Sequence, residues 1–143
     1  MNIFKQSLIN KKIIVLDFDG VIMDTNLLKQ KVFKTLYRDF NKKILHKIIE
    51  YHSNNDGTSR FEKIKYINKN IINNYYTNKE ISIFINNFNK ISYELLCKSK
   101  YVPGVVNFLQ KSCINKIILI NSAAPTFELK KFLNNKIINK YIT

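Results

Sequence analysis

The chain contains two short, continuous runs of aliphatic residues that lie far apart in the sequence. The first run, residues 13–16, ends at Asp17, and the second, residues 117–120, ends at Asn121. A continuous apolar run is typical of a strand that is buried on both faces, as in the parallel sheets of α/β proteins. We therefore expect both runs to be fully buried strands of a parallel sheet.

Most of the sequence between these runs repeats its apolar residues with the 3.6-residue period of amphipathic helices. The period predicts helices over residues 28–40, 61–71 and 81–96, the second with Thr58 or Ser59 as its N-cap. A shorter helix is predicted from Val105 to about residue 112, and a last one from Pro125 or Thr126. Aromatic residues in the central helices are expected to form their core: Tyr66, Tyr75, Tyr76, Phe84 and Phe88.

The order of these elements predicts an α/β fold with a helical insertion. One helix suffices to connect two parallel strands, so the additional helices must form a unit of their own. We expect residues 1–25 and 102–143 to form the α/β core and residues 26–101 to form the insertion. The length of 143 residues suits one compact domain with such an insertion.

The formal charge of +14 raises the question of a nucleic-acid partner. Of the 24 basic residues only Arg38 and Arg60 are arginines, and the lysines are scattered in ones and twos along the chain. Recognition of phosphates and bases favours the planar guanidinium group. The composition thus does not favour nucleic acid as a partner, although it suits anionic small molecules.

The sequence also predicts a cytoplasmic protein without a membrane partner. It has no apolar run of the roughly 18 residues that a membrane span needs, and residues 1–12 lack the apolar stretch of a secretory signal. The two cysteines, Cys97 and Cys113, suit a reduced, buried pair better than a disulfide scaffold.

The candidate chemistry begins directly after the first apolar run. Asp17 and Asp19 follow the predicted strand, and Gly20 permits a tight turn there with positive φ. Ligands bind open α/β sheets outside the carboxyl ends of the strands. Two carboxylates in one pocket need a compensating cation, and ligands that are all oxygen favour Mg²⁺. The alternative interpretation is an ordinary turn between a strand and a helix.

Residues 13–25 closely resemble the first motif of the haloacid dehalogenase (HAD) superfamily, especially its phosphatases. Residues 117–122 resemble the second motif, and the helices between them resemble the α-helical cap of phosphoglycolate phosphatase and β-phosphoglucomutase relatives. Residues 101–105 resemble the return from cap to core. The resemblance implies a HAD-like Rossmannoid core with an inserted cap over residues 26–101.

The resemblance also implies roles for individual residues. Asp17 would be the nucleophile that forms an aspartyl-phosphate, and Asp19 the general acid and base. The Asp17 carboxylate and the Asp19 backbone carbonyl would hold Mg²⁺. Ser122, with backbone N–H groups around Ala123, would bind a phosphate oxygen. A plain N-cap of the last helix is the alternative for Ser122.

In capped relatives the turn between the first cap helices selects the substrate. The resemblance therefore makes Arg60, next to Gly57 in a glycine-containing loop, the candidate for binding an anionic substrate. A surface cation is the alternative for Arg60. His52 is interpreted as a structural histidine.

The sequence departs from the family pattern after the second motif. The family also uses a lysine and an acidic pair further along the chain, whereas this sequence ends at Thr143. We therefore expect the core to be incomplete, and to be completed by a further C-terminal segment or by another chain.

The expected function is that of a Mg²⁺-dependent phosphatase acting on a small phosphorylated metabolite, such as phosphoglycolate or a sugar phosphate. Whether these residues alone are an active enzyme stays open at this point. The alternatives are a phosphomutase, a non-catalytic remnant that binds phosphate or a partner, and a basic protein associated with nucleic acid.

Overall fold

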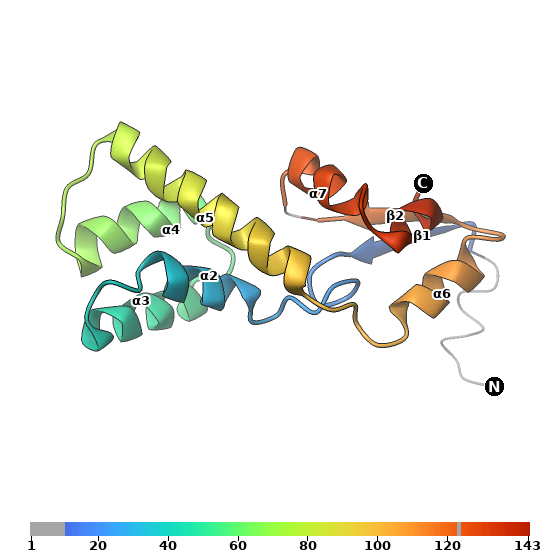
Figure 1. Ribbon diagram of the computed structural model, residues 1–143, viewed down its shortest axis with the longest axis horizontal. Helices are drawn as coiled ribbons and strands as arrows, with labels where there is room; N and C mark the ends of the chain where they lie inside the picture. Colours follow the sequence, from blue (N-terminus) through green and yellow to red (C-terminus); the bar gives the residue numbers. More distant parts are fainter. Residues whose placement is uncertain (1–10, 123) are drawn as a thin grey trace. The chain divides into compact units, whose positions relative to one another are not determined.

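The structure, a computed structural model, describes residues 11–122 and 124–143, which fall into two compact units (Figure 1). The first, here called the sheet unit, comprises the described residues up to Asn26 together with Ser99–Thr143. The second, the helical unit, comprises Leu27–Lys98. No helix in the described ranges is long and apolar enough to cross a membrane.

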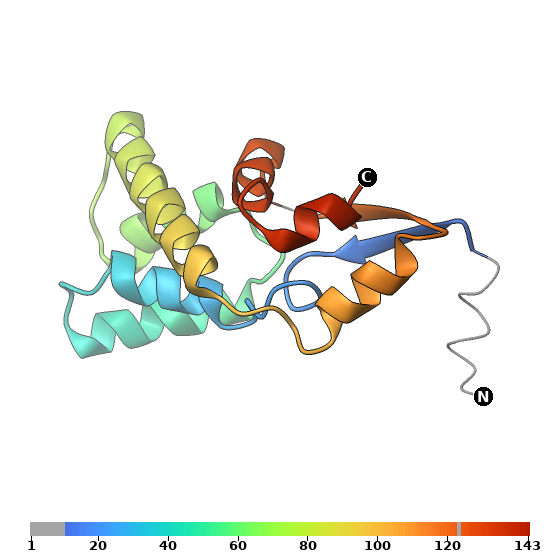
Figure 2. The ribbon, with the colours of Figure 1, turned by 45° about the vertical axis from the view of Figure 1, so that its right-hand side comes forward.

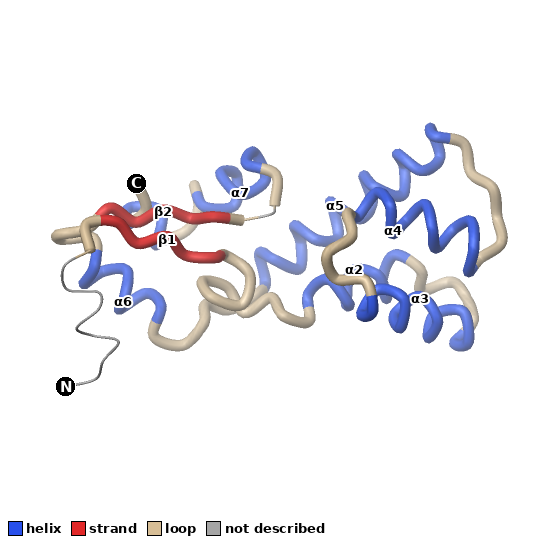
Figure 3. The backbone as a smooth tube through the Cα atoms, turned by 180° about the vertical axis from the view of Figure 1, so that it is seen from behind, coloured by secondary structure: helices blue, strands red, loops and turns tan. Residues whose placement is uncertain are grey.

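Two parallel strands form the sheet, as the sequence predicts. Strand β1 spans Ile13–Asp17 and strand β2 spans Ile117–Asn121, with Ile13 opposite Ile117 and Asp17 opposite Asn121 (Figure 3). The register brings the last residues of both strands to the same edge of the sheet. This edge is where the sequence places its candidate chemistry.

The prediction that both strands are buried on both faces is wrong for the described residues. Ile14 and Ile118 are 7% and 0% exposed, whereas Val15 and its partner Leu119 are 58% and 37% exposed. Successive side chains of a strand point to opposite faces, so the exposure alternates along each strand. The described residues therefore cover one face of the sheet and leave aliphatic side chains on the other.

The other elements of the sheet unit are short helices. They are α6 (Val105–Ser112), which begins after Gly104 with φ +85°, α7 (Thr126–Leu133) and the 3₁₀ helix η2 (Ile137–Tyr141). Helix α6 has the predicted bounds. Their buried side chains build the core of this unit with Ile14 and Ile118: Val105, Leu109, Phe132, Leu133 and Ile138.

The helical unit contains four α-helices and one π-helical turn. They are α2 (Leu28–Leu36), α3 (Lys42–Asn54), α4 (Arg60–Tyr66), the π turn η1 (Ile67–Ile71) and α5 (Asn78–Lys98). The long helix α5 lies alongside α2 and also contacts α4 (Figure 2). Ser59 caps α4, as predicted, because its Oγ accepts a hydrogen bond from the Glu62 N–H.

An aromatic cluster forms the centre of the helical unit. The ring of Phe33 lies 6.5 Å from Tyr37, 4.7 Å from His52 and 5.2 Å from Phe88. Phe33, Tyr37 and Phe88 are all 5% exposed or less. His52 is buried as well, which agrees with its interpretation as a structural residue.

Two aromatic residues that were expected in this core lie on its surface instead. Tyr66 is 43% exposed, because α4 and η1 bury Lys63, Ile64, Ile67 and Asn68 instead. Tyr75, in the connection between η1 and α5, is 77% exposed. The cysteines also differ from the expectation, since Cys97 is exposed and Cys113 half-buried, although neither forms a disulfide.

Candidate active site

The candidate site lies at the carboxyl edge of the two-stranded sheet. Asp17 is the last residue of β1 and pairs with Asn121, the last residue of β2. Ser122 follows Asn121 directly, and adjacent strands lie about 4.7–4.9 Å apart. The sheet register therefore brings Asp17 and Ser122 to the same edge, although they are far apart in the sequence.

A tight turn follows β1 and places Asp19 beside this edge. The carbonyl oxygen of Phe18 accepts hydrogen bonds from Ile22 N and Met23 N, both at 3.0 Å, and Gly20 N donates to Met23 O at 2.8 Å. Gly20 has φ +72°, as the sequence suggested. A Cβ atom there would overlap the side chain of Asn26, so the turn needs glycine on two grounds.

The turn is held to the segment that precedes α6. Val102 N donates to Ile22 O at 3.0 Å, and Asp24 N donates to Lys100 O at 2.9 Å. Phe18, which is 2% exposed, packs edge-on against Phe132 of α7 at 5.7 Å between ring centroids. Backbone pairing and apolar packing thus fix the residue that separates Asp17 from Asp19.

Each candidate carboxylate is oriented by a short hydrogen bond. Asp17 Oδ1 accepts the N–H of Phe18 at 2.7 Å, and Asp19 Oδ1 accepts the hydroxyl of Thr25 at 2.7 Å. Thr25 is only 5% exposed. The sequence pattern did not indicate Thr25, whose only signal is a hydroxyl six residues after Asp19 in a chain that turns back at Gly20.

The donor set of this edge fits Mg²⁺ in its chemistry. Asp17 and Asp19 offer only oxygen atoms, and each carboxylate has about four lone-pair positions, more than a single hydrogen bond uses. Mg²⁺ typically takes one or two protein carboxylates together with waters and substrate phosphate. Among the described residues no group of three or more His, Cys, Asp or Glu side chains gathers at one place.

Ser122 does not act as the N-cap of the last helix. Its Oγ accepts the N–H of Ala124 at 3.1 Å, whereas the N-cap position of α7 is Pro125. The alternative that treated Ser122 as a plain N-cap is therefore wrong. Ala123, the other residue expected to bind phosphate, lies outside the described residues, and the phosphate contact of Ser122 stays a prediction.

Arg60 and Gly57 belong to the helical unit. Arg60 is the first residue of α4, where its Nη1 donates to Asn89 Oδ1 and its guanidinium lies 5.5 Å from the ring centroid of Phe88. Arg60 is thus oriented by α5. Gly57 is in an open loop, and a Cβ atom at this position would meet nothing within 4 Å. Their role in binding substrate stays a prediction.

Comparisons with known proteins identify the fold. No protein-family model matches the sequence, and no curated protein matches it significantly. Three similar solved structures are a HAD hydrolase of family IA from Entamoeba histolytica, CbbY from Rhodobacter sphaeroides in complex with phosphate, and a protein assigned as a β-phosphoglucomutase from Thermotoga maritima.

These structures match almost the whole chain at low sequence identity. The TM-scores are 0.66, 0.62 and 0.67, the identities 13%, 12% and 16%, and the shares of this chain 93%, 92% and 92%, in the same order. The match covers 58%, 60% and 59% of the neighbours' own lengths. The chain thus has the α/β fold of HAD phosphatases and β-phosphoglucomutase-like proteins, over about three fifths of their length.

Proposed function

We propose that the chain carries the catalytic aspartates of a Mg²⁺-dependent phosphatase that hydrolyses the phosphoric monoester of a small metabolite, such as phosphoglycolate or a sugar phosphate. The observation that carries the proposal is the strand register, which places Asp17 opposite Asn121 and so brings Asp17 and Ser122 to the same edge of the sheet. The Asp19 carboxylate, oriented by the Thr25 hydroxyl, completes the arrangement. The similarity to HAD structures supports it.

In the proposed reaction Asp17 is the nucleophile and Asp19 the proton carrier. A carboxylate oxygen of Asp17 forms a bond to phosphorus while the bond from phosphorus to the ester oxygen breaks, and Asp19 gives its proton to the leaving alcohol. Asp19 then takes a proton from water, whose oxygen forms a bond to the phosphorus of the aspartyl-phosphate while the bond from phosphorus to the Asp17 oxygen breaks. Inorganic phosphate leaves, and both aspartates return to their starting states.

Other residues bind the charged groups of the substrate in this proposal. Ser122 and the N–H groups around Ala123 would hold a phosphoryl oxygen, and the Asp17 carboxylate with the Asp19 carbonyl would hold Mg²⁺. When bound, the cation neutralises charge on the phosphoryl oxygens. From the resemblance to capped relatives we also propose Arg60, which Asn89 and Phe88 orient within the helical unit, as a residue that binds an anionic group of the substrate.

The second candidate is a phosphomutase, and one similar structure favours it, because the Thermotoga maritima protein is assigned as a β-phosphoglucomutase. A mutase would use Asp17 and Asp19 in the same roles but return the phosphoryl group to another hydroxyl of the sugar. A test for isomerised sugar phosphate beside the test for free phosphate separates the two reactions.

The test measures phosphate release from phosphoglycolate and a panel of sugar phosphates with Mg²⁺. We expect Asp17→Asn to lower kcat by about 10³-fold or more, because it removes the nucleophile. Asp24→Asn is the matched control, since Asp24 is exposed and its substitution removes the same charge from the segment that follows β1. Equal rates for Asp17→Asn and the parent chain would refute the assignment of the nucleophile.

A non-catalytic remnant is separated by a binding measurement. Beryllium fluoride with Mg²⁺ mimics a phosphoryl group on an aspartate, so calorimetry with this pair reports the site without turnover. Binding that Asp17→Asn abolishes, without phosphate release from any substrate or isomerised sugar phosphate, would favour a phosphate-binding role over catalysis.

A further inference from the structure

Aromatic rings and lysines alternate on the solvent side of α4 and η1 in the helical unit. Along residues 61–70, pairs of exposed residues alternate with pairs of buried residues. The side chains at 61, 62, 65, 66, 69 and 70 face solvent. These residues are Phe61, Glu62, Lys65, Tyr66, Lys69 and Asn70. None of them is aliphatic, so the apolar area of this surface comes from its aromatic rings.

The rings of this surface lie near lysines or stack on another ring. Lys65 Nζ lies 6.0 Å from the ring centroid of Phe61, and Lys69 Nζ lies 6.0 Å from that of Tyr75. Tyr66 stacks on Tyr51 of α3 with 4.1 Å between centroids and 7° between ring planes. Each ring thus has one face against a cation or another ring.

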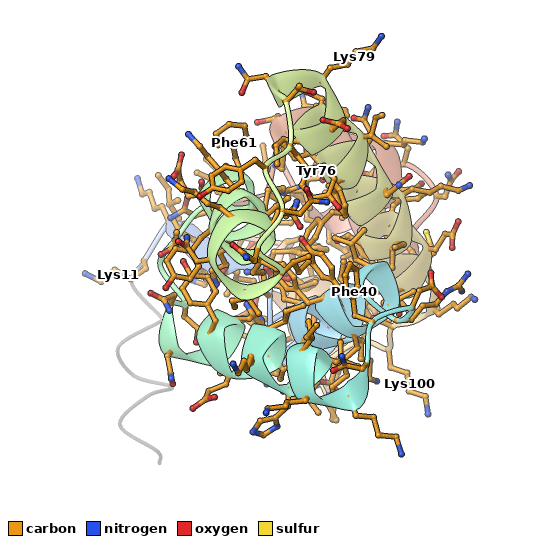
Figure 4. The ribbon with its side chains drawn as sticks, turned by 90° about the vertical axis from the view of Figure 1, so that its left-hand side faces the viewer. Lys11, Phe40, Phe61, Tyr76, Lys79 and Lys100 are labelled. Atoms are coloured by element: carbon orange, nitrogen blue, oxygen red, sulfur yellow. The ribbon has the colours of Figure 1, made fainter. Side chains whose placement is uncertain are left out.

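The exposure of these rings leaves area for a ligand. Tyr75 is 77% exposed, Tyr66 43% and Phe61 39%, and Phe61 lies at the periphery of α4 (Figure 4). By contrast, Tyr76 packs edge-on against Phe84 of α5 at 5.1 Å. The aromatic residues of this region therefore divide into packed rings and rings that are presented to solvent.

From this arrangement we infer that the surface formed by Phe61, Lys65, Tyr66, Lys69 and Tyr75, here called the aromatic–lysine surface, binds single-stranded nucleic acid. Unpaired bases stack on exposed aromatic rings, and lysines next to the rings attract the phosphates of the same strand. A membrane is the less suitable partner, because binding in the interface relies on a broad apolar helix face. The inference does not depend on the proposed phosphatase activity.

The composition of the chain alone did not favour this partner, because its lysines are scattered along the sequence. In the folded chain, however, two of these lysines lie close together. The four-residue spacing of Lys65 and Lys69 puts them on one side of consecutive helical turns. Glu62 is the acidic residue on this side, and it opposes the binding of phosphates. Its removal therefore provides a test with a predicted gain.

The experiment measures the fluorescence anisotropy of fluorescein-labelled oligo(dT) and oligo(U) of about 12 nucleotides with the full chain. We expect Tyr66→Ala and Tyr75→Ala each to weaken binding by about tenfold, and Tyr75→Phe to bind like the parent chain, since it keeps the ring. Lys65→Gln should weaken binding and reduce its salt dependence, and Glu62→Gln should strengthen binding by about twofold.

Controls separate this surface from the general positive charge and from the candidate active site. Lys34→Gln, an exposed lysine of α2, removes the same charge and should change the affinity less than twofold. Asp17→Asn should bind oligonucleotide like the parent chain. Circular dichroism and urea unfolding establish that the tyrosine variants are folded.

Four results would overturn the inference. They are unchanged affinity in both tyrosine-to-alanine variants, equal losses in Lys34→Gln and Lys65→Gln, equal binding of a duplex of the same length, and binding to phosphatidylserine vesicles without binding to oligonucleotide. The second result would assign binding to net charge, and the last would assign the surface to a membrane.

Discussion

The two units of the chain bury their apolar residues to different degrees. In the helical unit five successive elements contribute to one aromatic and aliphatic core, in which Val32, Ile48, Ile64 and Ile67 are all 0% exposed. In the sheet unit the candidate site sits on two strands whose alternate side chains, Ile13, Val15, Ile117 and Leu119, are 37–58% exposed. The residues proposed for catalysis thus lie on the unit with the less complete core.

This difference follows from the kinds of contact that each unit needs. Helices that are adjacent in sequence can bury their apolar faces against one another through short connections. A parallel sheet presents two faces, and both need to be covered by other elements. The apolar faces of a helical unit can therefore be covered by segments that are close in sequence. The faces of a parallel sheet depend on segments that are far away along the chain.

The largest expected effect tests the core of the helical unit. Phe33→Ala should lower the free energy of unfolding by about 3–5 kcal/mol, because it leaves a cavity between Tyr37, His52 and Phe88. Phe127→Ala is the matched control in the sheet unit, since Phe127 is 70% exposed and the change should stay within about 0.5 kcal/mol. Urea unfolding measures both, and equal losses would contradict the contrast.

The next effect concerns the turn that carries Asp19. Gly20→Ala should cost about 1–3 kcal/mol and reduce phosphate release, because an alanine with φ +72° is strained and its Cβ overlaps Asn26. Gly57→Ala, the same change in an open loop of the helical unit, should be neutral or stabilise by about 0.4–1 kcal/mol. Thermal unfolding compares the two, and a neutral Gly20→Ala would show that the turn adopts another conformation.

A smaller effect is expected from the hydroxyl that orients Asp19. Thr25→Val keeps the shape of the side chain but removes the hydrogen bond to Asp19 Oδ1, so kcat for phosphate release should fall about tenfold with little change in KM. The control is Thr35→Val on the exposed side of α2. A tenfold loss in the control as well would assign the effect to general destabilisation.

A buried pair of ionisable side chains in the helical unit, His52 and Lys63, should make the stability of the chain depend on pH. Lys63 Nζ lies 3.1 Å from His52 Nδ1 and donates to His52 O at 3.2 Å, with both side chains buried. Burial, and then the Lys63 charge, lower the pKa of His52, and burial lowers the pKa of Lys63. The unfolded chain therefore binds more protons than the folded chain just below each ordinary pKa.

The sign of this effect is fixed by proton linkage. Stability should fall as the pH drops below about 6.5, where His52 is protonated first in the unfolded chain, and should rise towards pH 10.5 as Lys63 becomes neutral. Urea midpoints at pH values between 5.5 and 7 measure the first part. Lys63→Met should flatten this slope, whereas His46→Gln, at an exposed position, should leave it unchanged.

Local patterns of the sequence predicted most of the fold correctly. The aliphatic runs identified β1 and β2, the helix predicted from Val105 is α6, and Ser59 was among the predicted caps of α4. These features depend on residues that are close together in the chain. The exposure of Val15 and of Tyr75 was not predicted, because it depends on what other segments cover.

The candidate site likewise has features that nearby residues predict and features that depend on how the chain folds. The turn at Gly20 follows from its own residue type, and its positive φ was predicted. The hydrogen bond from Thr25 to Asp19 was missed, since it depends on how the chain folds back after this turn. The pairing of Asp17 with Asn121 could be predicted only by treating both aliphatic runs as parallel neighbours.

The smallest expected effect tests whether the open face of the sheet is solvent-exposed in solution. Val15→Thr exchanges a methyl group for a hydroxyl at a side chain that is 58% exposed, so the free energy of unfolding should change by less than about 0.5 kcal/mol. Ile118→Thr makes a related change on the covered face, at 0% exposure, and should cost several times more because its hydroxyl would be buried. If both variants lose the same stability in urea, the face that carries Val15 is covered in solution, and the contrast between the two units disappears. If only Ile118→Thr is destabilised, the sheet unit folds with one face open.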